Sequence, residues 1–208
     1  HFDSYRALAA RLDAQLHGPD GIAAFTRLDR EQDNLRAALK WGLEIGQKKA
    51  VLRLVNHLFF FWIRRGYWGE AEQWNKVAVS LADQHDDPDL CMALIQLSTF
   101  IAIQGRFAEA GPYLPRALPM ARRLAQTQPL VMALMTLGQA VPDPEEAYAI
   151  WDEAIALAEA DERFTWQLAN IQMHYGDRLR EYGRYAEATS RYNQSLKLMQ
   201  QLGNVDMI

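Results

Sequence analysis

The sequence predicts an all-α fold, a right-handed α-solenoid of about five antiparallel helix pairs. Two patterns and one absence support this prediction. A Gly–Arg–aromatic–Ala–Glu–Ala segment at residues 183–188 recurs at 105–110 and, in a variant form, at 66–71. A small residue follows each hinge, at Ala71, Ala110, Ala147 and Ala188, and another small residue comes seven positions later each time. No stretch alternates polar and apolar residues with a period of two, so we expect no strands.

The segment at 183–188 predicts a turn between two helices. Gly183 can end the first helix with a positive φ because it has no Cβ. We expect Tyr185 to fill the apolar gap between the helices, and Ala188 to let them cross closely. In the third copy this hinge, residues 141–144, is shortened and should differ in geometry.

The spacings of the four hinge alanines are 39, 37 and 41 residues. A period near 39 with this hinge resembles the tetratricopeptide repeat, whose minimal unit has about 34 residues. The alternative is a generic helical bundle in which the alanine spacing is accidental.

The N-terminal pair, residues 1–48, is expected to act as an atypical cap or connector. Apolar residues at helical spacing predict helices from Phe2 to Leu16 and from about Ile22 to about Ile45, with Gly18-Pro19 between them.

Tetratricopeptide-like repeats should follow over residues 49–208, at about 49–87, 88–126, 127–162 and 163–203. Four consecutive aromatics at 59–62 cover more than one helical face, so their helix should be sandwiched between neighbours. In the second repeat, Pro115 and Pro119 should kink or loosen the second helix. The expected helices are Ala50–Arg65, Gly69–Asp83, Leu90–Gln104, Ala108–Ala125, Thr127–Ala140, Pro144–Ala160, Phe164–Tyr182 and Tyr185–Leu202.

Composition excludes several classes of protein. The net charge of −4 over 208 residues gives no basic footprint for nucleic acid. A single cysteine, Cys91, excludes an internal disulfide framework and fits a reducing compartment. No apolar run approaches the 18 residues of a membrane span, so we expect a cytoplasmic protein. The start is neither Met nor a signal peptide, which suggests a piece of a longer protein.

The segment from Leu16 to Trp41 carries a more specific signature. Its parts are residues 16–20 (LHGPD), 28–31 (LDRE) and 33–41 (DNLRAALKW). This segment resembles large bacterial signal-transduction ATPases of the STAND class, which include maltose-activator-like transcription factors. The resemblance implies a sensor or interaction region that follows nucleotide-binding and winged-helix modules. It does not transfer catalysis, because the chain contains no Gly-x-x-x-x-Gly-Lys-Ser/Thr loop.

Chemical site candidates are weak, and we expect no catalytic residue, cofactor or metal. The histidines show no metal-ligand spacing. An acidic cluster lacks the glycine turn and final glutamate of a calcium loop, so a solvated turn is the better interpretation. Cys91 begins a helix, where its pKa could fall, but a buried small filler is favoured. The acidic cluster comprises Asp83, His85, Asp86, Asp87 and Asp89.

The first helix of each pair should line a concave surface that binds a protein, a peptide or a small inducer. Four methionines on it could form an adaptable apolar stripe, or they could belong to the core between repeats. A Lys/Asn carboxylate clamp is disfavoured, because only Asn56 fits it. The groove candidates are Asn56, Phe60, Arg64, Met92, Gln96, Thr99, Met132, Met135, Gln139, Asn170, Met173, His174, Asp177 and Arg180.

The leading hypothesis is a non-enzymatic sensor and protein-interaction region of a multidomain bacterial regulator. The runner-up is a stand-alone scaffold or adaptor, and an enzyme with a hidden site is the third possibility. We expect no nucleic-acid or membrane contact through this segment. Residues 202–208 resemble the lead-in to another repeat, so the C-terminal repeat could support self-association.

Overall fold

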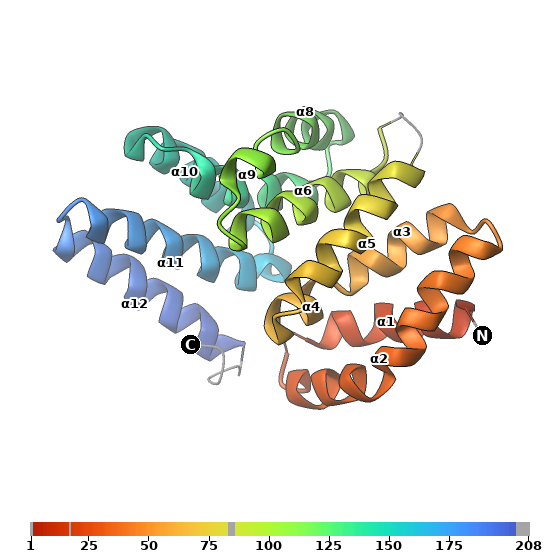
Figure 1. The fold of residues 1–208 in the computed structure, drawn as a ribbon. Helices are drawn as coiled ribbons and strands as arrows, with labels where there is room; N and C mark the ends of the chain where they lie inside the picture. Colours follow the sequence, from red (N-terminus) through yellow and green to blue (C-terminus); the bar gives the residue numbers. More distant parts are fainter. Residues whose placement is uncertain (1, 17, 83–85, 203–208) are drawn as a thin grey trace. The chain divides into compact units, whose positions relative to one another are not determined.

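The computed structural model describes residues 2–16, 18–82 and 86–202, and every regular element in these ranges is a helix (Figure 1). The all-α prediction is therefore confirmed. None of the described helices combines the length and the hydropathy that a membrane span requires. The helices are α1 (Phe2–Gln15), α2 (Gly21–Glu44), α3 (Lys48–His57), α4 (Phe59–Arg65), α5 (Trp68–Leu81), α6 (Pro88–Ile103), α7 (Phe107–Ala110), α8 (Leu114–Leu124), α9 (Thr127–Ala140), α10 (Pro144–Ala158), the 3₁₀ turn η1 (Glu162–Phe164), α11 (Thr165–Glu181) and α12 (Tyr185–Gln201).

The chain divides into two compact units. Unit 1 comprises residues 1–124 with α1 to α8, and unit 2 comprises residues 125–208 with α9 to α12. The division of the sequence into a cap of residues 1–48 and four repeats after it stays a prediction.

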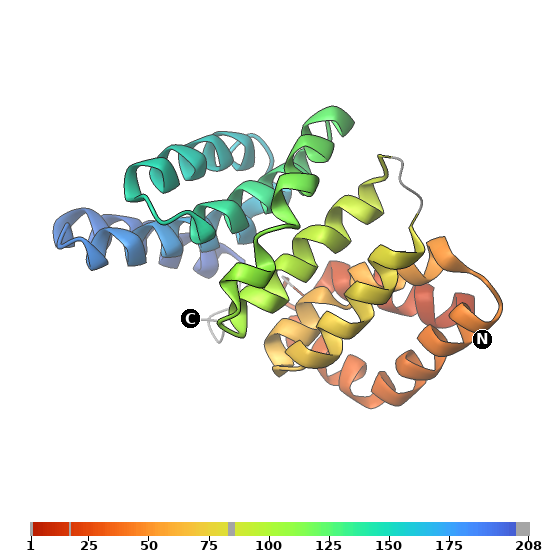
Figure 2. The ribbon, with the colours of Figure 1, turned by 45° about the horizontal axis from the view of Figure 1, so that its top comes forward.

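In unit 1 each helix packs on its neighbours in the chain. Helices α1 and α2 pack on each other and on α3, and α3, α5, α6 and α8 follow in succession (Figure 2). The aromatics at 59–62 are all buried, as expected for a sandwiched segment. The Phe59 and Trp62 rings lie edge-on to Phe100 of α6, with centroids 5.3 and 6.5 Å away.

Two predicted single helices are each divided in two, which corrects the sequence-based prediction. The helix expected over Ala50–Arg65 is interrupted at Leu58, whose N–H bonds to the carbonyl of Val55, three residues back instead of four. This local tightening separates α3 from the aromatic run of α4.

The helix expected over Ala108–Ala125 is also wrong as a single element. A turn at residues 111–113 separates α7 from α8. Pro115 then falls in the first turn of α8, where its missing N–H leaves no helical bond unmade. Pro119 lies inside α8, which continues through it to Leu124. The interruption therefore comes before the two prolines that were expected to cause it.

The hinge positions confirm the repeat pattern. Ala71, Ala110, Ala147 and Ala188 are all buried, and so are the small residues seven positions later. Gly183 has a φ of +76°, as predicted, and Gly66 and Gly105 have similar values. The expected geometric difference in the third copy is also present, because Val141 is extended, with φ −71° and ψ 126°.

Unit 2 packs α9 on α10, α10 on α11, and α11 on α12. A side chain at Gly138 would not fit, because a Cβ there would lie 2.4 Å from Nε1 of the buried Trp151. The expected packing role of Tyr185 is wrong: its side chain is 68% exposed. It is the first residue of α12, and the buried small residue of this hinge is Ala188, which is 2% exposed.

Candidate functional site

Five of the predicted groove residues form one stripe along α11 in unit 2. Their spacing of three and four residues places them on a single face of the helix. Met173 is 36% exposed, so its thioether is accessible on this face. Arg180 is exposed as well. We call this face the α11 stripe; it comprises Asn170, Met173, His174, Asp177 and Arg180.

The polar groups of the α11 stripe are partly organised by α12. The Tyr192 hydroxyl donates a hydrogen bond of 2.8 Å to Asp177. Nδ1 of His174 and the guanidinium of Arg180 lie 4.0 and 3.9 Å from the same carboxylate. Burial lowers the pKa of His174, although Asp177 opposes this effect, so the imidazole is neutral at pH 7. The stripe therefore presents an exposed thioether beside a neutral imidazole and an accessible guanidinium.

The candidates on α9 are placed differently. Met132 and Met135 are buried, at 3% and 6% exposure, and Gln139 is exposed. Their burial leaves the α9 methionines no accessible thioether for a ligand, so Met173 is the accessible methionine among the unit 2 candidates. Arg178 of α11 fixes the neighbouring hinge by donating to the carbonyls of Val141 and Pro142 at 3.0 and 3.2 Å.

The candidates in unit 1 mostly hold α3, α4 and α6 together. Phe60 and Gln96 are buried, and the Gln96 amide donates to the carbonyl of Asn56 at 3.3 Å. The Asn56 amide in turn donates to the carbonyl of Asp89 at 2.9 Å. Met92 and Thr99 are half-buried, and only Arg64 is fully exposed among the six unit 1 candidates. These residues therefore serve packing more than they offer a binding surface.

Acidic residues before and in α6 pair with cations, which the sequence analysis did not anticipate. Lys49 lies 3.1 Å from Asp87, Arg53 lies 2.8 Å from Asp89, and Asp86 pairs with a guanidinium of α8 at 2.6 Å. Asp87 also caps α6 by accepting from the N–H of Asp89. The sequence offered one signal of this pairing, because Arg53 and Asp89 are separated by about one repeat. Asp83 and His85 of the predicted cluster lie outside the described residues.

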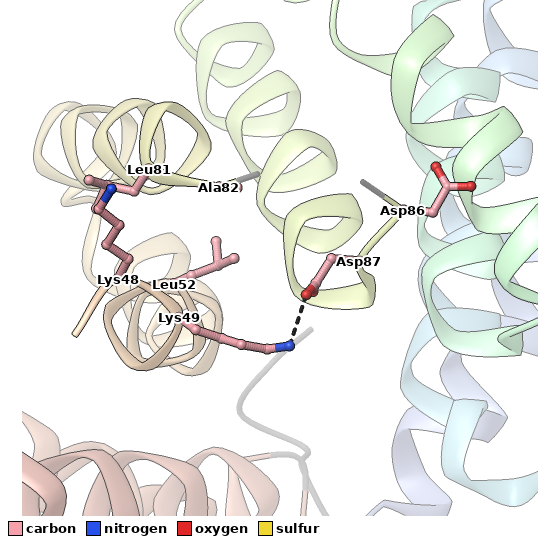
Figure 3. Close-up of a pocket in the computed structure, with 7 residues that line it drawn as sticks. All are labelled: Lys48, Lys49, Leu52, Leu81, Ala82, Asp86 and Asp87. Carbon is pink, nitrogen blue, oxygen red and sulfur yellow. Dashed lines mark ion pairs between the residues drawn. The ribbon is translucent and has the colours of Figure 1, made fainter. Parts of the chain in front are cut away.

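A cavity of about 310 Å³ lies beside these ion pairs, between the start of α3, the end of α5 and the start of α6 (Figure 3). Figure 3 shows Lys49 reaching Asp87 while Lys48 extends toward Leu81. The two aspartates that line the cavity are already engaged by cations, and no nucleophile with an adjacent base lines it. The lining residues are Lys48, Lys49, Leu52, Leu81, Ala82, Asp86 and Asp87.

Cys91 is a buried residue of the core. Cys91 is fully buried, and its thiol donates to the carbonyl of Ala117 at 3.3 Å. Burial raises the pKa of the thiol to about 11, and Asp86 adds to the effect, so the thiol stays protonated. The buried-filler interpretation is confirmed. Within the described ranges, no group of three or more His, Cys, Asp or Glu side chains could hold a metal ion.

Comparisons with known proteins agree with the fold. Over 98% of its length the chain superposes on BtubC (BKLC) of P. vanneervenii, covering 92% of that chain, with a TM-score of 0.64 at 15% identity. It also superposes on a Podosopora anserina structure named "putative kinesin light chain nearly identical TPR-like repeats", with a TM-score of 0.53 at 14% identity. The superposition covers 91% of this chain and 97% of that chain. The chain therefore has the fold of tetratricopeptide-like helical solenoids.

In sequence, the chain is 32% identical over 180 residues to proteins of Mycobacterium tuberculosis and Mycobacterium bovis. Both are named "Putative HTH-type transcriptional regulator". The matched region is 79% of this chain but only 20% of each of those proteins, so the chain spans about a fifth of the length of the curated relatives that it matches. No family model matches the chain.

Proposed function

We propose that this chain is a non-enzymatic sensor and protein-interaction region of a multidomain bacterial transcriptional regulator of the STAND class, working in the cytoplasm. The observation that carries the proposal is the 32% identity to proteins named as HTH-type regulators, over four fifths of the chain. The tetratricopeptide-like fold and the segment Leu16–Trp41 support it independently.

The α11 stripe is the surface on which we expect a partner to bind. A flexible thioether adapts to apolar side chains of different shape, and the guanidinium of Arg180 suits carboxylates. A peptide or protein segment with an apolar residue near an acidic one fits this chemistry, because the stripe offers an exposed thioether and an exposed guanidinium on one face of one helix. Phe60, Gln96, Met132 and Met135 are left out of the proposed surface because they are buried.

As a sensor region, the chain would pass a binding event to other modules of its protein. Thermodynamic linkage requires the ligand to bind the active arrangement more tightly than the resting one. The alternative, a stand-alone scaffold, needs no such difference. The complete reading frame separates the two: a phosphate-binding loop and a DNA-binding helix-turn-helix support the regulator, and their absence overturns it in favour of the scaffold.

The surface is tested by a two-hybrid screen of the 208-residue chain against a genomic fragment library of its own species. Fragments that bind the wild type are retested against Met173→Glu and Arg180→Glu. We expect the two-hybrid signal to fall at least about tenfold in both variants. Met173→Glu places a charge at an apolar contact, and Arg180→Glu replaces a cation by an anion. The matched control is Lys197→Glu on the exposed face of α12, which should leave binding unchanged.

Melting temperatures distinguish a lost surface from a lost fold. Met173→Glu should shift the melting temperature by no more than about 2 °C, because the side chain is already accessible. Met135→Glu should lower it strongly, because this charge would be buried. Fragments that bind both α11 variants as well as the wild type would exclude the α11 stripe as the binding surface.

A further inference from the structure

The N-terminal helix pair carries a second surface, distinct from the α11 stripe. A cavity of about 250 Å³ and another of about 310 Å³ lie along the seam between α1 and α2, and Tyr5 lines both. The lining residues of α2 lie between Arg27 and Trp41, mostly three or four positions apart, and those of α1 lie between Phe2 and Arg11. Two facing stripes at helical spacing bound one groove along the seam. We call it the seam groove.

One end of the seam groove is apolar. Phe2, Tyr5 and Ala38 line the smaller cavity, and Trp41 stands at its edge with 53% of its surface exposed. The core of this pair is formed by other residues, such as Ala9, Leu28 and Leu35, which are buried and line neither cavity. Trp41 is therefore not needed for the core, and an exposed tryptophan beside an apolar cavity is typical of a protein contact.

The other end of the seam groove is cationic. Arg11 is exposed and makes no polar contact with another described residue. Arg27 lies 2.7 Å from Glu31, but the arginine side chain is 54% exposed while the glutamate is only 13% exposed. The accessible charge at this end is therefore positive, although the whole chain carries −4.

The geometry points to an amphipathic helix of another protein as the occupant of the seam groove. We propose that this helix places a large apolar side chain beside Trp41 and a carboxylate between Arg11 and Arg27. The two cavities are centred about eight or nine residues apart along α2, or about 13 Å, which corresponds to two or three turns of a docked helix. A helix laid in the groove between two helices is a common recognition mode, and Trp, Tyr and Arg are the residues that dominate such contacts.

The probe for this proposal is a displayed library of 16-residue peptides on an alanine-rich helical frame, with the positions of one face randomised. Selection against the 208-residue chain should enrich peptides that carry an apolar residue and an Asp or Glu eight or nine positions away. Binding of the enriched peptides should fall at least about tenfold in Trp41→Ala and in Arg11→Glu. The Arg11 contact should also weaken at high salt.

Matched controls are Arg30→Glu, an exposed arginine of α2 that lines neither cavity, and Trp68→Ala, a 37% exposed tryptophan of α5. Both should bind the enriched peptides like the wild type. The proposal is overturned if the enriched peptides bind Trp41→Ala and Arg11→Glu as well as the wild type, or if they are basic instead of acidic.

Two further measurements identify other occupants, and either would overturn the assignment to a partner protein. Sedimentation equilibrium would reveal a dimer that Trp41→Ala dissolves, which would make a second copy of the chain the occupant. Failure of the full-length protein to bind peptides that bind this chain would assign the groove to another segment of the same protein. Neither result depends on Met173 or Arg180, so this proposal and the α11 stripe can fail separately.

Discussion

The same hinge arginine makes two different interactions in the two units. In unit 1, Arg106 stands four residues before Ala110 and forms an ion pair with Glu72, the residue after Ala71. In unit 2, Arg184 stands four residues before Ala188, and its guanidinium lies 5.3 Å from the ring centroid of Tyr148, the residue after Ala147. One position of the repeat therefore holds a carboxylate in one unit and an aromatic ring in the other.

The surroundings of the two residues differ accordingly. Glu72 is 7% exposed and also accepts hydrogen bonds from Lys76 at 2.6 Å and Gln104 at 2.9 Å. Tyr148 is 5% exposed and stacks on Tyr175, with centroids 4.8 Å apart and an interplanar angle of 11°. The carboxylates that Arg184 contacts, on Glu187 and Glu145, are exposed.

The comparison shows that the repeat fixes where the arginine reaches, while the residue after the hinge alanine decides the kind of contact. A buried carboxylate makes stability depend on pH, and a buried ring makes it depend on packing. The two units should therefore respond to different perturbations.

The largest effect on stability is expected from removing the aromatic ring of Tyr148. Tyr148→Ala should lower the free energy of unfolding by about 3 kcal/mol, because it leaves a cavity and removes the stacking partner of Tyr175. Urea denaturation measures the loss. The control is Tyr185→Ala, whose exposed ring should contribute no more than about 0.5 kcal/mol. Equal losses from the two changes would contradict the packing role of Tyr148.

A second effect of similar order, which depends on pH, is expected at Glu72. Burial alone would raise its pKa, but hydrogen bonds from Lys76, Arg106 and Gln104 outweigh burial and lower the pKa from 4.5 to about 2. Between these values the unfolded chain binds more protons than the folded one, so stability falls as the pH drops through this window. The contribution is fully present above about pH 4.5 and is on the order of 3 kcal/mol.

Comparison of the wild type with Glu72→Gln isolates this contribution. The wild type should be more stable at neutral pH, and the difference should shrink as the pH falls from about 5 toward 2, as followed by urea denaturation at each pH. A difference that stays constant over this range would show that the carboxylate of Glu72 does not carry the interaction.

The smallest effect is expected from removing only the hydroxyl group of Tyr148. Tyr148→Phe should change the free energy of unfolding by no more than about 0.5 kcal/mol, because the buried Tyr148 hydroxyl makes no hydrogen bond of normal geometry and interacts at most weakly with the guanidinium of Arg184. The ring, and with it the contact to Arg184, remains. A loss above about 1 kcal/mol in thermal or urea unfolding would mean that the hydroxyl has a role of its own.

Much of the fold could be predicted from local patterns. The expected helices over Phe2–Leu16, Thr127–Ala140 and Tyr185–Leu202 agree with α1, α9 and α12 to within one residue. Helix boundaries were predictable where Gly, Pro or Asp residues determine the backbone conformation or the hydrogen bonds of the adjacent helix end. The Asp143 side chain, for example, accepts from the N–H groups of Glu145 and Glu146 at the start of α10.

The candidate sites could be predicted less well. Met132, Met135 and Met173 share a repeat pattern in the sequence, yet two are buried and one is accessible. The seam groove was not foreseen, because Trp41 and Arg11 lie on different helices and Trp41 belongs to the apolar pattern of its helix, although the structure leaves it 53% exposed. The break at Leu58 was hidden as well, since the aromatic run after it has no helix-breaking residue.

The sequence by itself determined the all-helical fold, most of the helix boundaries and the spacing of the hinges, because glycine φ, caps and small residues act over a few neighbouring positions. Only the tertiary structure decided which repeated positions became core and which stayed open. It also decided that Arg106 meets a carboxylate and Arg184 meets a ring. Burial and partner choice depend on side chains about one repeat away in the chain, and no local pattern records what those side chains will contact.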